Sequence, residues 1–143
     1  MQVRDLMTTD VDLVRPDETI RDAAMKMRSL DVGSIPVCDG ERLLGMLTDR
    51  DITLRAVAEG LDPSSTRVRD AMTADVVYVF EEQDVDEAAR KMEERQIRRL
   101  PVLNAQKRLV GILSLGDLAV GTRDPELAGQ TLQEVSEPAQ PKR

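Results

Sequence analysis

The chain has 143 residues, of which 41% are apolar and 33% charged, and its formal net charge is −7. This composition is typical of a soluble globular protein and argues against a nucleic-acid partner, because nucleic-acid binders usually carry a basic stripe. The chain has no histidine and a single cysteine, Cys38, so it cannot form an internal disulfide or the usual nucleophile–base pairs of enzymes. We therefore expect no catalytic residues, no metal site and no enzymatic activity.

The N-terminal stretch is polar, and no apolar run reaches the length that spans a membrane. We therefore expect a cytoplasmic protein without a membrane partner.

The first half of the chain predicts the element order β-α-β-β-α. Apolar residues recur at helical spacing over 20–27, and short β-branched runs lie before and after this stretch. Pro36 predicts that its strand lies at an edge or begins near this residue. The expected elements are a strand at 11–14, a helix whose apolar face carries Ile20, Ala23, Ala24 and Met27, strands at 35–37 and 43–47, and a helix beginning at Thr48.

The second half repeats the first. The segment VRDLMTTDV at 3–11 returns as VRDAMTADV at 68–76, and GMLTDRD at 45–51 returns as GILSLGD at 111–117. Agreement that extends through the intervening residues indicates a duplication. The second set of expected elements is a strand at 76–80, a helix whose apolar face carries Val85, Ala88, Ala89 and Met92, strands at 100–102 and 109–113, and a helix beginning at Ser114.

These patterns predict an α/β (α+β) protein made of tandem repeats. We place repeat 1 at 1–60, a linker at 61–67, repeat 2 at 68–122 and a tail at 123–143. The linker is predicted from its Pro and Ser residues. In the tail we expect a short amphipathic helix on Leu127, Leu132 and Val135, followed by a disordered end, EPAQPKR.

The repeated motif places a hydroxyl residue and an aspartate at the start of each final helix. Thr48 and Ser114 stand where backbone N–H groups are unpaired, and Asp51 and Asp117 lie one turn further along. Such a pair could bind a phosphate and the two hydroxyl groups of a ribose. The same spacing is also that of a capping box, which satisfies these N–H groups without a ligand. Both explanations stay open from the spacing alone.

The paired β-α-β-β-α halves, the two Pro-Val strands and the two G-h-h-[ST]-x-x-D endings (h, apolar) resemble the CBS-domain family over about residues 1–121. Two such repeats form a CBS pair, or Bateman module. The stretch GMLTDRDI also resembles stand-alone bacterial CBS-pair proteins of the hypoxic-response kind. The resemblance implies pseudo-two-fold symmetry, two clefts, a homodimer and an adenosine compound as regulatory ligand, with no cofactor required.

The resemblance also implies roles for individual residues. Asp51 and Asp117 would hold ribose, and Thr48 and Ser114 would contact phosphate. Adenine would lie against the residues that lead into the Pro-Val strands, which are Val32, Gly33, Ile35 and Pro36 in one half and Ile97, Arg98, Leu100 and Pro101 in the other. The alternative for Ile35 and Leu100 is that they are core strand residues.

The two clefts are not expected to bind equally. Arg98 and Arg99 of the second half replace Gly33 and Ser34, whereas Arg50 of the first motif becomes Gly116 in the second. Arginine suits polyphosphate, and Arg50 makes the first motif the better-matched polar site. The alternative for Arg98 and Arg99 is that they are solvated surface arginines.

We expect a regulatory module that binds AMP, ADP, ATP or S-adenosylmethionine and acts in trans as an energy or stress sensor, with a possible unidentified protein partner. The alternative is a structural or protein-interaction module whose clefts are vestigial and bind no ligand.

Overall fold

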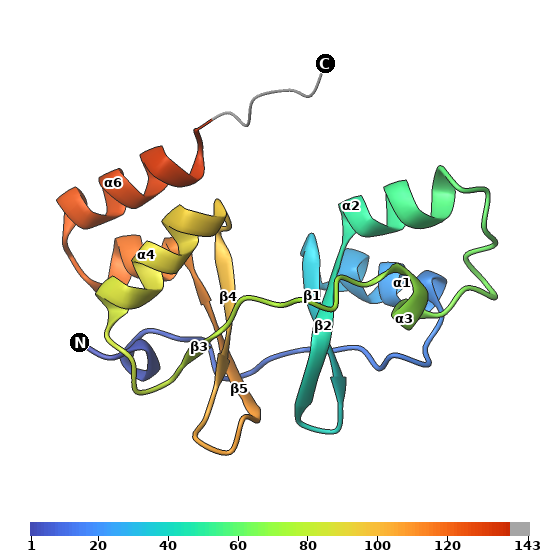
Figure 1. Cartoon of the computed structure of the whole chain (residues 1–143), viewed down its shortest axis with the longest axis horizontal. Helices are drawn as coiled ribbons and strands as arrows, with labels where there is room; N and C mark the ends of the chain where they lie inside the picture. The colour runs from blue at the N-terminus through green and yellow to red at the C-terminus, as the bar shows by residue number, and fades with distance from the viewer. Residues whose placement is uncertain (138–143) are drawn as a thin grey trace. The chain divides into compact units, whose positions relative to one another are not determined.

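The computed structural model describes residues 1–137 and divides the chain into two compact units (Figure 1). The first, here the Thr48 unit, is Asp12–Val76; the second, the Ser114 unit, joins Met1–Val11 to the chain from Val77 onward. Each unit therefore combines parts of both sequence repeats. The VRD-x-MT segments at 3–8 and 68–73, here called the exchanged segments, each fold with the core of the other repeat. Of the tail that was expected to be disordered, all but Glu137 lies outside the described residues.

The Thr48 unit is built on an antiparallel pair of strands. Its elements are α1 (Ile20–Leu30), β1 (Ser34–Asp39), β2 (Arg42–Thr48), α2 (Asp49–Ile52), the π-helical segment η2 (Thr53–Val57) and α3 (Val68–Ala71). The strand predicted at 11–14 was wrong, since only Val14 forms a bridge, parallel to Val37. Residues before Asp12 belong to the Ser114 unit, so the pairing of Val14 is not extended toward the N-terminus.

Helix α1 forms where the sequence predicts it, between two clear end signals. The Thr19 hydroxyl accepts a hydrogen bond from the Asp22 N–H at 3.2 Å, and Asp31 ends the helix in the left-handed conformation. Ile20, Ala23 and Met27 are buried as expected, and Ala24 is half-buried. The core of the unit consists of Val14, Ile20, Ala23, Met27, Ile35, Val37, Leu47, Ala56, Val68 and Ala71.

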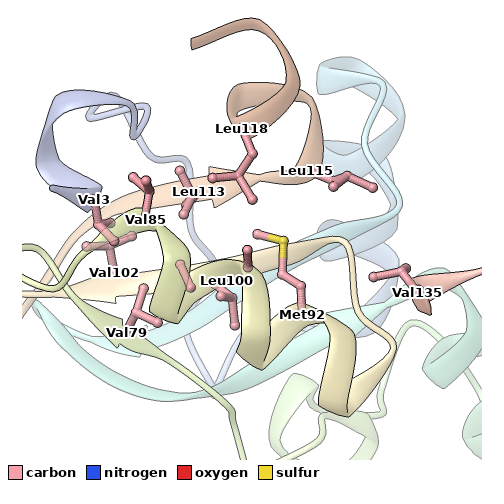
Figure 2. Packing of buried hydrophobic residues seen from close by; sticks show 12 residues of the cluster. Val3, Val79, Val85, Met92, Leu100, Val102, Leu113, Leu115, Leu118 and Val135 are labelled. Atoms are coloured by element: carbon pink, nitrogen blue, oxygen red, sulfur yellow. The ribbon is translucent and has the colours of Figure 1, made fainter. Parts of the chain in front are cut away.

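The Ser114 unit adds a third strand and an extra helix to the same plan. Its elements are η1 (Val3–Asp5), β3 (Val79–Phe80), α4 (Val85–Arg95), β4 (Arg99–Leu103), β5 (Leu109–Ser114), α5 (Leu115–Gly121) and α6 (Pro125–Val135). Strand β4 is parallel to β3 and antiparallel to β5. Figure 2 shows Val3 and Val135, from opposite ends of the described chain, in one core with Met92 and Leu100.

Helix α6, drawn in red in Figure 1, packs against α4 and α5. The helix was predicted, but Leu132 is 49% exposed and does not belong to the buried face. Thr131 is buried in its place, and its hydroxyl lies 2.9 Å from Oε1 of Glu93 on α4 and 2.8 Å from the carbonyl oxygen of Leu127. A polar side chain can occupy this position because it is hydrogen-bonded.

The exchanged segments dock on the glycine that opens each repeated motif. In the Thr48 unit, Thr73 and Met46 exchange two backbone hydrogen bonds, and a Cβ added at Gly45 would lie 2.6 Å from the Thr73 carbonyl oxygen. In the Ser114 unit, Thr8 and Ile112 exchange the corresponding bonds, both at 2.9 Å. Glycine is therefore required where the backbone of the exchanged segment approaches the strand.

Candidate functional site

In the Thr48 unit the motif residues form a closed capping box. The Asp51 N–H donates to the Thr48 hydroxyl at 2.9 Å, and the Thr48 N–H donates to Oδ2 of Asp51 at 3.0 Å. The hydroxyl of Thr73, on the exchanged segment, donates toward the same carboxylate at 3.3 Å from Oδ1. This carboxylate is therefore held by its own helix start and by the exchanged segment.

The Ser114 unit repeats the box with one difference. The Asp117 N–H donates to the Ser114 hydroxyl at 3.0 Å, and the Ser114 N–H donates to Oδ2 of Asp117 at 2.8 Å. Thr8 occupies the position that corresponds to Thr73, yet within residues 1–137 no hydrogen bond reaches Oδ1 of Asp117. The half-buried Asp117 thus keeps one acceptor oxygen free, whereas both oxygens of Asp51 are approached by protein donors.

The capping explanation of the motif is therefore realised in both units. A capping box uses the hydroxyl oxygen as an acceptor, so the Thr48 and Ser114 hydroxyls can still donate a hydrogen bond. Capping and ligand binding are compatible at these residues.

The residues expected around adenine fall into two groups, one buried and one at the surface. Ile35 and Leu100 are 1% and 0% exposed and belong to the two cores, and Pro36 and Pro101 are also buried. Only backbone groups of these four residues could meet a ligand.

The remaining expected residues lie at the surface beside the motif. Val32 and Ile97 are half-buried, whereas Gly33 and Arg98 are exposed. The Gly33 and Arg98 carbonyl oxygens accept the N–H of the first residue of α2 and α5, at 3.0 and 2.8 Å. The structure therefore brings Gly33 next to Thr48, and Arg98 next to Ser114.

A cavity of about 520 Å³ lies beside the second motif, between the start of β4, α5 and α6. Its lining contains Arg98, Arg99, Ser114, Leu115, Gly116, Ala119, Ala128, Gly129 and Leu132. Sequence reasoning missed the contribution of α6, because this helix has no counterpart in repeat 1 and no motif of its own. Asp117 and the first-half residue Arg50 do not line this cavity, and Arg50 is exposed.

Cys38 lies in β1 and is completely buried, and burial raises the pKa of its thiol to about 11. A thiol with such a pKa is a poor nucleophile at neutral pH. Within residues 1–137 no cluster of three or more Asp, Glu, Cys or His side chains could hold a metal ion. Over the same residues, no helix has both the length and the apolar character needed to span a membrane.

The family model of the CBS domain matches residues 3–57 and 68–120. The CBS domain-containing protein YhcV of Bacillus subtilis is 45% identical over 134 residues, which cover 94% of each chain. Hypoxic response protein 1 of Mycobacterium tuberculosis is 42% identical over 117 residues and 81% of each chain.

Solved structures give the same result. The crystal structure of Hypoxic Response Protein I, described with two coordinated zinc ions, matches with a TM-score of 0.76 and 41% identity over 83% of this chain and 97% of that one. The hexameric CBS-CP12 protein from bloom-forming cyanobacteria matches with a TM-score of 0.70 and 31% identity over 84% and 67%. The two matched segments cover most of the chain, and it belongs to the CBS-domain family as a protein with two CBS domains.

Proposed function

We propose that this CBS pair binds an adenosine nucleotide or S-adenosylmethionine and acts as a regulatory module without catalytic activity of its own. CBS-pair proteins are generally regulatory ligand-binding modules. The observation that carries the proposal is the free Oδ1 of Asp117, next to a serine hydroxyl that can still donate. An acceptor-only carboxylate suits the two hydroxyls of ribose, and the hydroxyl suits a phosphate oxygen.

An energy or stress signal would follow from the concentration of the ligand. A ligand can shift an equilibrium between two states only by the difference in its affinity for them. The module would therefore act in trans by pairing differently with itself or with a protein partner when the nucleotide is bound.

The test is a calorimetric titration of nucleotide-stripped protein with AMP, ADP, ATP and S-adenosylmethionine. A ligand at a hundredfold excess over its Kd should add about 2.7 kcal/mol to the free energy of unfolding, which raises the melting temperature of a chain of this size by roughly 3–5 °C. Asp51→Ala and Asp117→Ala should weaken binding unequally, whereas Asp86→Ala, at an exposed carboxylate of α4, should leave it unchanged. A flat response to all four compounds at millimolar concentration would reject the proposal in favour of a structural or interaction module.

We also propose that the chain forms a homodimer. Leu54, Val57 and Leu61 are 46%, 62% and 44% exposed on and just after η2 of the Thr48 unit. Neighbouring exposed apolar side chains are typical of a contact surface, and the related CBS-CP12 protein is described as hexameric. Sedimentation should give twice the chain mass of 15.9 kDa at micromolar concentration, and Val57→Lys should shift it toward the monomer. A wild-type monomer across that range would contradict the dimer.

A further inference from the structure

We propose that Met7 is an oxidation site, and that its sulfoxide loosens the docking of the N-terminal exchanged segment on Gly111. This segment folds with the Ser114 unit, and the Met7 side chain packs against the core of that unit. The proposal concerns a docking surface within the chain and does not rest on the binding of a nucleotide, so the proposed function can stand or fail without it.

The thioether of Met7 lies against the glycine that receives the segment. A Cβ added at Gly111 would be 2.7 Å from Sδ and 3.0 Å from Cγ of Met7, so this side chain fills the space that the glycine leaves. One residue further on, Thr8 and Ile112 exchange two backbone hydrogen bonds at 2.9 Å. The sulfur is therefore part of the contact that pairs the segment with β5.

Exposure places Met7 between the reactive and the protected methionines of the chain. Access governs how readily a sulfur is oxidised, and a half-buried side chain is within reach of a small oxidant. Met7 should therefore react after the exposed methionines and before the buried ones. Of the seven methionines, Met1 and Met25 are exposed, Met7, Met46 and Met72 are half-buried, and Met27 and Met92 are buried.

The chemical step is the oxidation of a thioether by a peroxide. Hydrogen peroxide transfers one oxygen atom to Sδ of Met7, its O–O bond breaks, and the remainder leaves as water, so the sulfur is oxidised and the peroxide reduced. The product carries a polar S=O group where an apolar sulfur stood. Such an acceptor has to be hydrogen-bonded or hydrated, whereas the sulfur lies against Gly111 and the core. Hydration moves the side chain away from Gly111 and weakens the neighbouring pairing of Thr8 with Ile112.

The start of the segment is anchored independently of the sulfur. Val3 is completely buried, and its N–H donates to the carbonyl oxygen of Gln83 at 2.8 Å. The Arg4 guanidinium lies 3.1 Å from Oε1 of Glu82. Oxidation of Met7 should therefore open the segment locally, around Thr8, and leave Val3 in the core.

The Thr48 unit has the same contact in a more firmly connected segment. Met72 stands at the position of Met7, and a Cβ added at Gly45 would lie 3.0 Å from its Sδ. Its segment is continuous with the rest of Asp12–Val76, whereas Met1–Val11 is joined to the rest of the Ser114 unit only through the whole Thr48 unit. Within its own unit Met1–Val11 is held by non-covalent contacts alone, so oxidation should loosen this segment more.

The test treats the full chain with hydrogen peroxide and locates the sulfoxides by peptide mass spectrometry. Met7→Leu removes the sulfur and keeps an apolar side chain of similar size, and Met25→Leu is its matched control at an exposed methionine of α1. Hydrogen–deuterium exchange follows the peptides that contain Thr8 and Ile112, and melting temperatures are measured in parallel. Methionine sulfoxide reductases, which restore the thioether, test whether the change is reversible.

In the wild type, the sulfoxide at Met7 should speed exchange of the Thr8 and Ile112 amides at least about tenfold. It should also lower the melting temperature by roughly 3–5 °C, and the reductases should reverse both changes. Met25→Leu should respond as the wild type does. Met7→Leu should keep slow exchange at Ile112 after the same treatment.

Three results would overturn the proposal. The first is a Met7 that stays reduced when Met1 and Met25 are fully oxidised, and the second is unchanged exchange at Ile112 once Met7 has reacted. The third is a treated Met7→Leu protein that opens at Ile112 as much as the wild type. Each protein is compared with its own reduced form, and the first two results need only the wild type, so the test holds even if Met7→Leu does not fold.

Discussion

The two units share one backbone plan and solve the same packing problem in opposite ways. In the Thr48 unit, the Arg55 guanidinium donates to the carbonyl oxygens of Ala71 and Met72 at 3.1 and 2.7 Å. In the Ser114 unit, Gly121 stands where the other unit has arginine, and Leu6 fills the space that a side chain at 121 would occupy. In the Thr48 unit the large Arg55 faces the small Ala71 of the exchanged segment. In the Ser114 unit the small Gly121 faces the large Leu6 of the exchanged segment. The contact between helix and exchanged segment therefore constrains the pair of residues and not either one alone.

The largest effect of a substitution is expected at the glycines that receive the exchanged segments. Gly45→Ala should lower the free energy of unfolding by about 3 kcal/mol, because the new Cβ would meet the Thr73 carbonyl oxygen at 2.6 Å. Gly111→Ala should cost about 2 kcal/mol, because its Cβ would meet the flexible Met7 side chain at 2.7 Å and the Thr8 carbonyl oxygen at 2.9 Å, a longer approach to backbone than at Gly45. Urea denaturation followed by circular dichroism measures both values.

Gly129→Ala is the control for these two variants, because its Cβ enters open space. It should leave the free energy of unfolding unchanged or raise it by up to about 1 kcal/mol. A Gly45→Ala protein as stable as this control would contradict the close approach of the exchanged segment.

The buried Cys38 thiol should lower the stability of the Thr48 unit at alkaline pH, and the Ser114 unit lacks this effect at the corresponding position, where it has Leu103. The buried thiol has its pKa raised from 9.0 to about 11, so its contribution is complete below pH 9 and is lost as the pH rises toward 11. Each pH unit in this window should lower the free energy of unfolding by roughly 1 kcal/mol. Cys38→Val removes the thiol and should show a shallower slope in pH-dependent urea denaturation, and parallel slopes would disprove the effect.

The size reversal at Gly121 and Leu6 predicts a coupled pair. Gly121→Ala should cost about 1–2 kcal/mol, because the added methyl group overlaps Leu6. Leu6→Ala in the same chain should relieve that overlap, so the double variant should be more stable than the sum of the single effects by about 1 kcal/mol. A double-mutant cycle measures this coupling, and strict additivity would mean that the two side chains do not compete for space.

The smallest and most equal effect is expected at the two caps. Thr48→Ala and Ser114→Ala should each lower the free energy of unfolding by about 1 kcal/mol, since each removes one hydrogen bond at the start of its helix. Chemical denaturation at neutral pH tests both variants. A difference between them as large as the cap effect itself would show that the helix starts are not equivalent.

Local features of the fold could be predicted from the sequence because they depend on neighbours in the chain. The capping pairs at Thr48 and Ser114 are fixed by a spacing of three residues, and helices α1 and α4 by their apolar periodicity.

The exchange of the N-terminal segments could not be predicted in the same way. Val3–Val11 and Val68–Val76 are so similar that either could pair with Gly45 or Gly111, and only long-range packing decides between them. The strand predicted at 11–14 failed for the same reason.

The candidate site was predictable as far as the repeat extends. Ser114 was identified because it matches Thr48 of the first motif, and Arg98 was identified from the family resemblance. Both residues line one cavity. Ala128 and Gly129 could not be identified, because no repeat, charge or motif marks α6 as a wall of the cavity. The burial of Thr131 in place of Leu132 depends on Glu93, 38 residues earlier, and periodicity alone cannot detect this partner.

The exchange of segments sets an order of events during protein synthesis. The Thr48 unit is continuous and can fold once Val76 has been made, whereas Met1–Val11 must wait for β5, which ends at Ser114. At about 5–20 residues per second, the ribosome needs about 2–8 s to proceed from Val76 to Ser114. Before 68–76 emerges, the earlier copy at 3–11 is free to occupy its place beside Gly45. A nascent chain that forms this pairing has to replace one copy by the other, and the rate of translation through residues 61–76 then sets how long the wrong pairing persists.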